Sequence, residues 1–597
     1  MHLNTLRISV IVGDKAREIT ISEEEAGNKS LLQHLQDNGI YLPALCGGHG
    51  SCGKCAVKVV SGLLKASDAD ESYFAPAAMS AGFRLACTAY PTEPIRIVLP
   101  DTHEEQFSVV SHFEALDRIV IKNLDRERIP IEKSPVSFAR QVNPAQSGMV
   151  SLHELEKIAR LAEQTQYNTG KNKVYVYRDK ETILHISDKP KDLYAIGIDI
   201  GTTTLALALV NLQTGTIQGR LSLVNKQREY GADLISRIQR ANDGDLPRLS
   251  QRIREQIGEA VITLCHTSAI EALDVVKMAI AGNTTMLHFL LNLRCDTLGY
   301  YPFTPITLDR VSFYYDEVFT GPLSCKVDVL PGISTYVGAD ITAGILCSNL
   351  YRSSEPVLLL DIGTNGEMAL FIPAHGPGGA GKILAAATAA GPAFEGGNIL
   401  WGTGSVPGAI ASVSYQSGGF AVQTIDNQDP IGICGSGVVD TVYAGLTHKL
   451  ILPNGRLRDQ TTGLFLAKTA DGQDILFCQK DVRELQLGKS AIRSGMDALL
   501  HQSGLRYEDI QQVFVAGGFG FKLPVASGVG IGLIPQALES KIRLIGNSAL
   551  GGTIRYLLDR DTSEILPQIL SISEEFSLSG DPYFNQLFIQ NLQLTSD

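Results

Sequence analysis

Apolar and polar positions alternate in short runs near the start of the chain, separated by residues typical of turns. Ile8 to Val12 and Ile19 to Ile21 follow the two-residue period of strands, and Ser30 to Asn38 has the apolar spacing of a helix. Further strands are predicted at Ala56 to Val60 and at Ile95 to Leu99. Residues 1–100 are therefore predicted to form one small domain of strands and a helix.

The next stretch has weaker patterning. Residues 101–116 are polar and lack clear periodicity, which predicts a linker, either a flexible tether or an ordered arm. In residues 117–190 we expect a small α+β middle domain with a structural or docking role, because no catalytic set of residue types stands there. Its predicted elements are a strand at Ile119 to Ile121, a helix opened by the capping box Ser151 to Glu154, and a hairpin formed by Val174 to Tyr177 and Ile183 to Ile186.

In residues 191–597 long apolar strands end in a repeated polar turn. The first copy is Asp199 followed by Gly201-Thr202-Thr203-Thr204, and the second is Asp361 followed by Gly363-Thr364-Asn365. In each copy an apolar strand enters the turn and another leaves it. Such a hairpin presents N–H and hydroxyl groups to a phosphate, while the aspartate faces the accompanying cation. One copy would be weak evidence, but two copies indicate two related halves.

Four cysteines have the spacing of a cluster-binding loop. Five residues separate Cys46 from Cys52, two separate Cys52 from Cys55, and thirty-one precede Cys87, close to the ferredoxin arrangement of four thiolates around a 2Fe-2S cluster. The intervening glycines suit a loop that takes positive φ angles and brings N–H groups to sulfur. A disulfide set and a zinc site compete, but we see no secretory signal and only one C-x2-C pair. We therefore predict a β-grasp ferredoxin domain.

Composition and charge narrow the function class. Of 597 residues, 44% are hydrophobic and 19% are charged, which is ordinary for a folded protein of several domains. The net charge of −12 argues against nucleic acid and against an anionic membrane surface. No apolar run of about 18 residues is free of glycine and charge, so no membrane span is predicted. The six other cysteines lack metal-ligand spacing and are expected to be buried thiols, so we expect a cytoplasmic protein.

The paired turns resemble those of the superfamily of acetate and sugar kinases, heat-shock chaperones and actin, in which two halves close over a nucleotide. The resemblance extends to Ala516-Gly517-Gly518-Phe519-Gly520, which matches the adenosine loop, and to Asn283 and Gly435, which look like starts of connecting helices. It implies a multidomain α/β protein in which residues 191–597 form an actin-like, two-lobed ATPase domain. A competing phosphate loop at Gly488-Lys489-Ser490 is rejected, because its earlier glycine would fall on Arg483 in a predicted helix.

A 2Fe-2S domain fused to this ATPase fold resembles the family of reductive activators of corrinoid proteins, which includes the activating enzymes of methyltransferase and O-demethylase systems in anaerobes. Further marks of the family are Tyr230-Gly231-Ala232-Asp233, Gly338-Ala339-Asp340 and Gly391-Pro392-Ala393-Phe394-Glu395-Gly396. The resemblance implies an ATP-hydrolysing iron–sulfur enzyme that transfers one electron from its cluster to reduce an inactive Co(II) corrinoid protein to Co(I). It also implies Mg²⁺ with the ATP and an upstream low-potential electron donor, and it allows for a homodimer.

The same resemblance implies roles for particular residues. The cluster would be held by Cys46, Cys52, Cys55 and Cys87. The nucleotide would be bound by Gly201, Thr202, Thr203, Asn283, Gly363, Thr364, Asn365, Gly435, Gly517 and Gly518. Asp199 and Asp361 would orient Mg²⁺ through water, and Glu367 either positions the attacking water or is an ordinary exposed carboxylate at a strand end. The glycine-rich segments 391–397 and 402–408 either touch nucleotide or partner or form only tight turns.

Three other functions stay open. An activator of 2-hydroxyacyl-CoA dehydratases shares the ATPase fold, but those proteins carry a 4Fe-4S cluster between subunits and no ferredoxin domain. A redox-regulated small-molecule kinase would need a substrate pocket with a catalytic base between the halves, and we see no clear base beyond Asp199 and Asp361. A nucleotide-dependent, chaperone-like binding module would use its cluster only to sense redox state.

Overall fold

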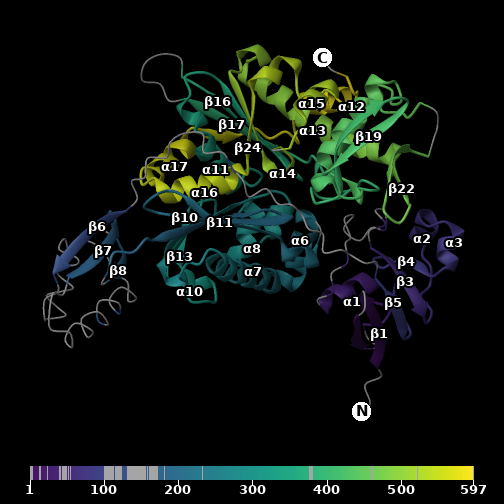
Figure 1. Cartoon of the computed structure of the whole chain (residues 1–597), viewed down its shortest axis with the longest axis horizontal. Helices are drawn as coiled ribbons and strands as arrows, with labels where there is room; N and C mark the ends of the chain where they lie inside the picture. The colour runs from purple at the N-terminus through teal and green to yellow at the C-terminus, as the bar shows by residue number, and fades with distance from the viewer. Residues whose placement is uncertain are drawn as a thin grey trace.

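The computed structural model describes residues 5–595 except for 13–14, 23–24, 39, 41, 43–49, 51–52, 54, 100–112, 114–123, 131–155, 157–158, 160–172, 181, 188, 232, 375–380, 459–461 and 521. Figure 1 shows an N-terminal domain, a small sheet at the opposite end of the molecule, and a large two-lobed body between them. The strand predicted at Ile119 to Ile121 and nearly all of the helix predicted from Ser151 lie outside the described residues.

The N-terminal domain is a β-grasp sheet with strand order β2-β1-β5-β3-β4. Strands β1 and β5 are parallel, and α1 packs its buried Leu31 and Leu35 against Ile8 and Val10 of the sheet. Ser30 caps α1 through a reciprocal capping box, so the predicted helix is confirmed. The elements are β1 Thr5–Val12, β2 Lys15–Ser22, α1 Leu31–Asp37, β3 Ala56–Ser61, α2 Asp68–Tyr73, α3 Pro76–Ser80, β4 Phe83–Leu85 and β5 Ile95–Val98.

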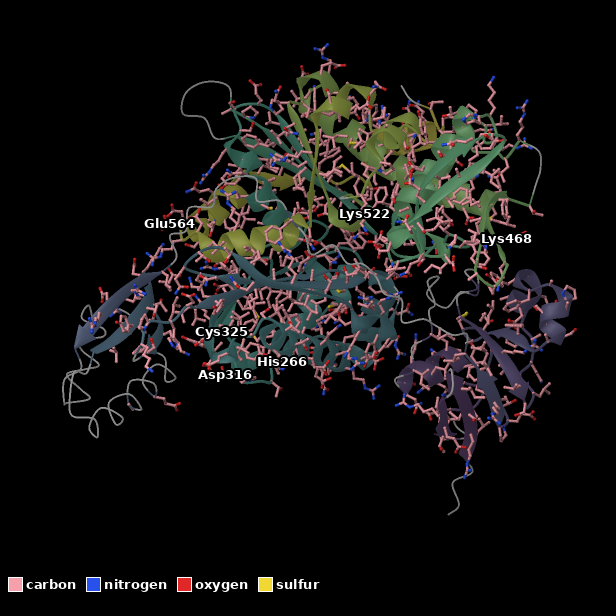
Figure 2. All side chains as sticks on the ribbon, viewed as in Figure 1. His266, Asp316, Cys325, Lys468, Lys522 and Glu564 are labelled. Atoms are coloured by element: carbon pink, nitrogen blue, oxygen red, sulfur yellow. The ribbon has the colours of Figure 1, made fainter. Side chains whose placement is uncertain are left out.

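The small sheet consists of the antiparallel strands β6 Asp125–Pro130, β7 Lys173–Asp179 and β8 Thr182–Ser187. The predicted hairpin is confirmed as β7 and β8, whereas β6 was not predicted, because its charged residues hide the strand pattern. Ion pairs fasten this sheet to the large body: Lys180 lies 2.8 Å from Glu564 of α17, labelled in Figure 2, and Arg560 lies 2.9 Å from Asp125. Lys277 also pairs with Asp179.

The two lobes repeat one topology. In lobe 1 the strands run β11-β10-β9-β12-β14-β13, and in lobe 2 β17-β16-β15-β23-β24 repeats the first five positions, with β25 added beyond β17. Alternate residues of β9 face opposite layers: Ile196 packs in the same cluster as Leu249 of α7, and Ala195 packs with Leu550 of α16. In lobe 2, Leu359 of β15 packs in one cluster with Ile345 of α11, and Leu358 packs in another with Leu499 of α13. Both sheets have helices on both faces, which confirms the predicted fold class.

The elements of lobe 1 are β9 Tyr194–Ile200, β10 Thr204–Asn211, β11 Ile217–Val224, α6 Leu234–Arg240, α7 Leu246–Thr267, β12 Val275–Gly282, α8 Thr284–Leu291, α9 Asp296–Gly299, β13 Val311–Tyr314, α10 Tyr315–Val318, β14 Lys326–Val329 and α11 Ala339–Ser348. Those of lobe 2 are β15 Val357–Ile362, β16 Gly366–Ile372, β17 Lys382–Thr388, β18 Ala409–Gln416, β19 Gly419–Thr424, β20 Gly432–Ile433, α12 Gly435–Thr447, β21 Leu464–Lys468, β22 Asp474–Phe477, α13 Gln479–Ser503, β23 Gln512–Ala516, α14 Gly517–Gly520, α15 Val525–Gly530, β24 Ile542–Gly546, α16 Ser548–Leu558, α17 Thr562–Ser571, β25 Ser573–Glu575 and α18 Pro582–Gln590.

The helices that join the lobes differ from the prediction. Helices do begin after Asn283 and at Gly435, but α8 stays against lobe 1 and α12 stays within lobe 2. The crossings are made by α11, which links β14 to β15, and by α16, which follows β24 of lobe 2 and packs on β9 and β12 of lobe 1. The two helices meet at small residues, since Gly552 lies directly against the Ala343 backbone.

The rejection of a phosphate loop at Gly488-Lys489-Ser490 is confirmed. These residues lie in the middle of α13, and the buried Lys489 ammonium donates to the carbonyl oxygens of Asn591 and Gln593, both at 2.8 Å. Lys489 therefore fastens the C-terminal segment to α13. Among the residues that the structure describes, no helix is long and apolar enough to cross a bilayer.

The crossing of α11 and α16 gives a stability prediction. In Gly552→Ala the added methyl group would overlap the Ala343 carbonyl group, so we expect the free energy of unfolding of the lobes to fall by about 1–3 kcal/mol. Gly580→Ala is the matched control, because no atom lies within 4 Å of the position of its methyl group. Thermal unfolding should separate the two variants by several degrees; equal transitions would contradict the close packing.

Candidate functional site

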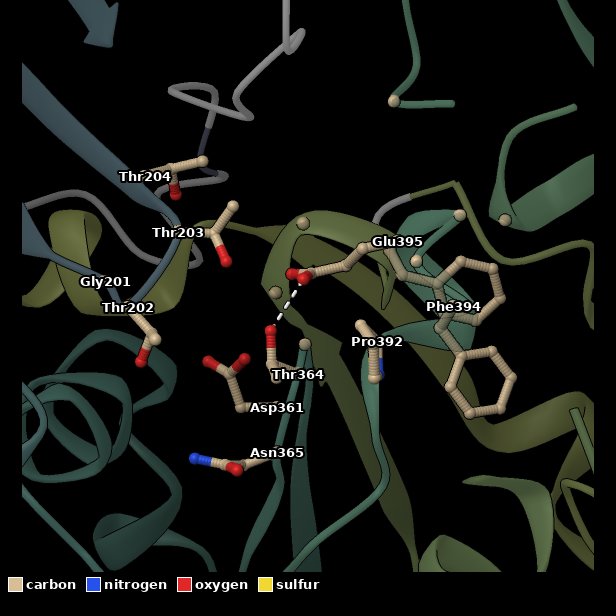
Figure 3. A pocket seen from close by; sticks show the side chains of 18 of the residues that line it. Gly201, Thr202, Thr203, Thr204, Asp361, Thr364, Asn365, Pro392, Phe394 and Glu395 are labelled. Atoms are coloured by element: carbon tan, nitrogen blue, oxygen red, sulfur yellow. Dashed lines mark hydrogen bonds between the residues drawn. The ribbon is translucent and has the colours of Figure 1, made fainter. Parts of the chain in front are cut away.

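The first hairpin of each lobe has a tight turn that begins at a glycine. The Gly201 N–H donates to the Thr204 carbonyl at 2.9 Å, and the Gly363 N–H donates to the Asn365 carbonyl at 2.9 Å. In Figure 3 the two turns face each other, with Thr202 and Thr203 on one side and Thr364 and Asn365 on the other. The duplicated topology therefore brings the two polar turns together.

A cavity of about 430 Å³ lies between these turns. Every residue predicted for the nucleotide site lines it: Asp199, Gly201, Thr202, Thr203, Asn283, Asp361, Gly363, Thr364, Asn365, Glu367, Gly435, Gly517 and Gly518. Both glycine-rich segments whose role stayed open also line it, through Gly391, Pro392, Phe394, Glu395, Gly396 and Gly397 and through Gly402, Thr403, Gly404 and Ser405. The cavity is thus built from segments spread over most of residues 199–549.

Half-buried and buried carboxyl groups dominate the chemistry of the cavity. Burial raises the pKa of Asp199 to about 7 and that of Asp340 to about 6. The pKa of Asp361 is also raised to about 7, by burial and then by repulsion from Asp340 and Asp199. Burial together with Asp340 and Asp361 raises the pKa of Glu367 well above its ordinary value. Like charges this close favour a bound cation.

One of the two predictions for Glu367 is wrong. Its side chain is 9% exposed and lies on β16 opposite Asp361, so it is not an ordinary exposed carboxylate at a strand end. A hydrogen bond with Asn365 partly offsets its raised pKa. Its place in the carboxylate group, next to the second turn, is compatible with the positioning of a water molecule.

The beginning of α16 holds the aspartates of both turns. Asn547 Nδ2 donates to Asp199 at 2.8 Å, and Ser548 Oγ donates to Asp361 at 3.4 Å. Asn547 also caps α16, because its Oδ1 accepts from the Leu550 N–H at 2.8 Å. One helix start therefore orients a carboxylate from each lobe. The sequence analysis missed both residues, since Asn547 and Ser548 stand in no recognisable motif.

Asn283 and Gly517 hold their parts of the wall in place. Asn283 caps α8 by accepting from the Met286 N–H at 3.0 Å, and its amide nitrogen lies 3.2 Å from Thr202 Oγ1. Gly517 has φ +92°, and a side chain there would come within 2.5 Å of Asp361 Oδ1. The predicted adenosine loop thus passes directly behind the second aspartate, where only glycine fits.

Glu395 accepts a hydrogen bond from the second turn and is influenced by a charge of the opposite lobe. Thr364 Oγ1 donates to Glu395 Oε2 at 2.7 Å, as the dashed line in Figure 3 shows. Burial raises the pKa of Glu395, and the positive charge of Arg228, which comes from lobe 1, works in the opposite direction. Lys522, labelled in Figure 2, is a second basic group of the cavity wall. Asp340 and Glu395 belong to family motifs quoted above, but no role was predicted for them. Arg228 and Lys522 belong to no motif and were not predicted from the sequence.

The cluster loop is described in part. Cys46 and Cys52 lie outside the described residues, while Cys55 and Cys87 have Sγ atoms 3.2 Å apart. That separation is too long for a disulfide bond of about 2.05 Å and suits two thiolates that share a metal. Gly53 has φ +70°, and any side chain there would overlap the Tyr73 ring. The described part of the loop therefore fits a 2Fe-2S cluster and explains one of its glycines.

Family models cover most of the chain. Residues 14–92 match the 2Fe-2S iron–sulfur cluster binding domain, residues 194–353 match the RACo middle region, and residues 355–597 match the C-terminal domain of RACo, the ASKHA domain. The described Cys55 and Cys87 and the whole cavity fall inside these three matches.

Relatives cover the chain from end to end. The corrinoid activation enzyme RamQ of Eubacterium limosum is 29% identical over 96% of this chain and 97% of its own length. The Co(II) methylated amine-specific corrinoid protein reductase of Methanosarcina barkeri is 25% identical over 67% of this chain and 77% of its own. A solved structure of a reductive activator for corrinoid, iron–sulfur protein superposes with a TM-score of 0.70 at 27% identity and covers 99% of both chains.

Because the pKa of Asp361 is raised, replacing this carboxylate should stabilise the nucleotide-free protein but weaken its stabilisation by Mg-ATP. The pKa of Asp361 is about 7 in the folded protein and lies above its value in the unfolded chain. The stability that the protonated carboxyl group contributes is therefore full below the unfolded pKa and is lost as the pH rises through the folded pKa. At pH 8, Asp361→Asn should raise the free energy of unfolding of the nucleotide-free protein by about 1 kcal/mol or more. The same variant should lose the stabilisation that Mg-ATP gives to the wild type.

Thermal unfolding at pH 5.5 and pH 8, with and without Mg-ATP, measures both effects. The gain from Asp361→Asn should be present at pH 8 and should shrink at pH 5.5, where the wild-type carboxyl group is protonated. A variant less stable than the wild type at pH 8 would contradict the repulsion among these carboxylates.

Proposed function

The chain belongs to the family of reductive activators of corrinoid proteins, and we propose that it uses ATP to deliver one electron from a 2Fe-2S cluster to a partner corrinoid protein, reducing inactive Co(II) to Co(I). The observation that carries the proposal is the union, in one chain, of a ferredoxin-type cysteine pair with a cavity into which the polar turns of two lobes point. The electrons balance, since the cluster loses the one electron that cobalt gains.

The two polar turns are assigned to the phosphates of ATP. Both turns line a cavity of suitable size, and Thr202, Thr203 and Thr364 place hydroxyl-bearing side chains on its wall. Gly517 and Gly518 lie beneath the adenosine, and Asn283 and Gly435 complete the wall at helix starts. Lys522 and Arg228 add positive charge for the phosphate oxygens. These residues bind and orient the nucleotide.

The carboxylates are assigned to Mg²⁺ and to water. Asp199 and Asp361 are held by Asn547 and Ser548 and would bind the cation through water molecules. The fit rests on the set of carboxylates that line the cavity together, because a divalent cation offsets the repulsion that raises the pKa of Asp361. Glu367 is buried beside them and is our candidate for positioning the water that attacks the terminal phosphate.

The need for ATP follows from the chemistry of cobalt. When bound, a plant-type 2Fe-2S cluster supplies single electrons near −400 mV, whereas Co(I) is so strong a nucleophile that its formation requires a lower potential. Each further ~59 mV disfavours the transfer about tenfold. Closure of the lobes around ATP helps only if the open and closed states bind the partner differently. Cys46, Cys52, Cys55 and Cys87 would hold the cluster that makes the transfer.

The remaining assignments follow from this chemistry. The partner is a corrinoid protein, and an upstream low-potential donor restores the cluster after each transfer. We place the protein in the cytoplasm, where the buried Cys265, Cys295, Cys325, Cys347 and Cys434 and the partly exposed Cys478 would stay reduced. A homodimer is part of the proposal and can be tested by sedimentation.

An anaerobic assay tests the proposal directly. The chemically reduced holoprotein is mixed with a Co(II) corrinoid protein from the same source, and the Co(I) absorption is followed with and without Mg-ATP. We expect Co(I) only with Mg-ATP. If ATP is hydrolysed and the cluster oxidises without any Co(I), the electron goes to another acceptor and the proposal is wrong.

Two variants should separate the halves of the reaction. Asp361→Ala should lower ATP hydrolysis by about a hundredfold or more, since it removes a carboxylate that orients the Mg²⁺ which stabilises charge on the transferring phosphoryl group. It should leave the visible spectrum of the cluster intact. Cys87→Ser should lose that spectrum and keep ATP hydrolysis within about twofold, because Cys87 lies in a separate domain. A normal rate of ATP hydrolysis in Asp361→Ala would contradict the assignment of the second turn to the nucleotide site.

A further inference from the structure

Phe113 lies in the segment that joins the ferredoxin domain to the large body, and it contacts both lobes. Its backbone forms an antiparallel bridge with Gly546, the last residue of β24 at the edge of the lobe 2 sheet. Its side chain is 8% exposed and packs in one cluster with Ala206 of β10 in lobe 1 and Leu550 of α16. The Arg220 guanidinium, from β11 of lobe 1, lies 5.6 Å from the centre of the ring.

The position of Phe113 is close to the nucleotide cavity. Gly546, its backbone partner, directly precedes Asn547 and Ser548, which hold the aspartates of the two turns. One turn further along α16, a methyl group on Gly551 would lie 3.2 Å from the Phe113 ring and 2.6 Å from Cys347 of α11. The ring therefore lies against the crossing of the two helices that join the lobes.

A residue held this way responds to any change in the angle between the lobes. Its backbone moves with β24 of lobe 2, whereas the pocket of its side chain is formed partly by β10 and β11 of lobe 1. Packed interfaces switch between discrete arrangements rather than deforming continuously. When the lobes close, the Phe113 side chain must either follow one lobe or repack between them.

The length of the connecting chain allows a positioning role of Phe113 to be distinguished from a role that only shortens the tether. From Leu99, the last described residue of the ferredoxin domain, to Phe113 the chain has 14 residues, and to Leu124, the next described residue, it has 25. Loss of the anchor would therefore lengthen the tether, and for a flexible chain the effective concentration of the ferredoxin domain would fall only about twofold. A much larger fall in Co(I) formed per ATP hydrolysed would therefore show that Phe113 does more than shorten the tether.

We propose that Phe113 is a positioning residue for electron delivery: it fixes the tether of the ferredoxin domain at the junction of the lobes, so that the nucleotide-dependent angle between the lobes sets the position of the cluster domain. The inference rests on the proposed function, because it assumes that the lobes bind ATP and that the cluster domain delivers the electron. Among the described residues, Phe113 does not line the nucleotide cavity and packs in a different cluster from Cys55 and Cys87, so it acts through the tether.

The experiment measures the position of the cluster domain separately from activity. In the full-length holoprotein the cluster is reduced and Mn²⁺ replaces Mg²⁺, so that pulsed dipolar EPR gives the distance distribution between cluster and metal. It is recorded with ADP and with a non-hydrolysable ATP analogue. The variants are Phe113→Ala, Arg220→Ala, and the matched control Phe584→Ala, whose ring is 9% exposed and packs within lobe 2 only. A parallel assay counts Co(I) formed per ATP hydrolysed.

We expect the wild type and Phe584→Ala to show different distance distributions with the two nucleotides. In Phe113→Ala the two distributions should coincide, and Co(I) per ATP should fall about tenfold or more, well beyond the twofold effect of a longer tether. Arg220 is exposed, so Arg220→Ala should fold normally and show a smaller change in the same direction. If Phe113→Ala does not fold, the result for Arg220→Ala decides whether the anchor positions the cluster domain.

Unchanged distributions and unchanged coupling in the Phe113 and Arg220 variants would overturn the inference, as would identical distributions in the wild type. The failure of the proposed function looks different. A wild type that forms no Co(I), but whose nucleotide-dependent distance shift disappears in Phe113→Ala, refutes cobalt as the electron acceptor and supports Phe113 as the anchor.

Discussion

The structure depends on one constraint: two aspartates from different lobes line the same cavity, and the first residues of a single helix hold them there. Asn547 and Ser548 donate to Asp199 and Asp361 at the start of α16, the helix that carries the chain from lobe 2 onto lobe 1. The relative position of the lobes and the geometry of the carboxylates are therefore set by the same residues. A ligand that neutralises the carboxylates necessarily acts on the lobe junction as well.

The sequence predicts the parts of this arrangement that are local in the chain. Apolar strands followed by Gly-Thr turns identified both hairpins, and every residue assigned from those turns and from the adenosine loop lines the cavity. Residues whose role depends on tertiary position escaped prediction. Arg228 and Lys522 are single basic side chains in unremarkable stretches, and Asn547 resembles any helix cap until its Nδ2 is seen beside Asp199.

The two incorrect or missing fold predictions have physical causes of the same kind. The starts at Asn283 and Gly435 are strong helix signals, but no local signal says whether a helix stays on its own lobe or crosses to the other, since that depends on strand order. Strand β6 has charged residues at four of its six positions, and it exists because its backbone pairs with β7 and its Asp125 with Arg560. Periodicity detects only strands that bury one face.

A polar contact joins the ferredoxin domain to the large body. Arg240 at the end of α6 lies 3.4 Å from Asp37 at the end of α1, and both side chains are about a quarter exposed. Such a pair contributes at most about 1 kcal/mol and is weakened by salt. Asp233, which caps the other end of α6, lines the nucleotide cavity. One helix of seven residues therefore links the cavity wall to this weak contact. Under our proposal, a change at the cavity reaches the contact through α6, and the cluster domain shifts with the nucleotide without unfolding of either lobe.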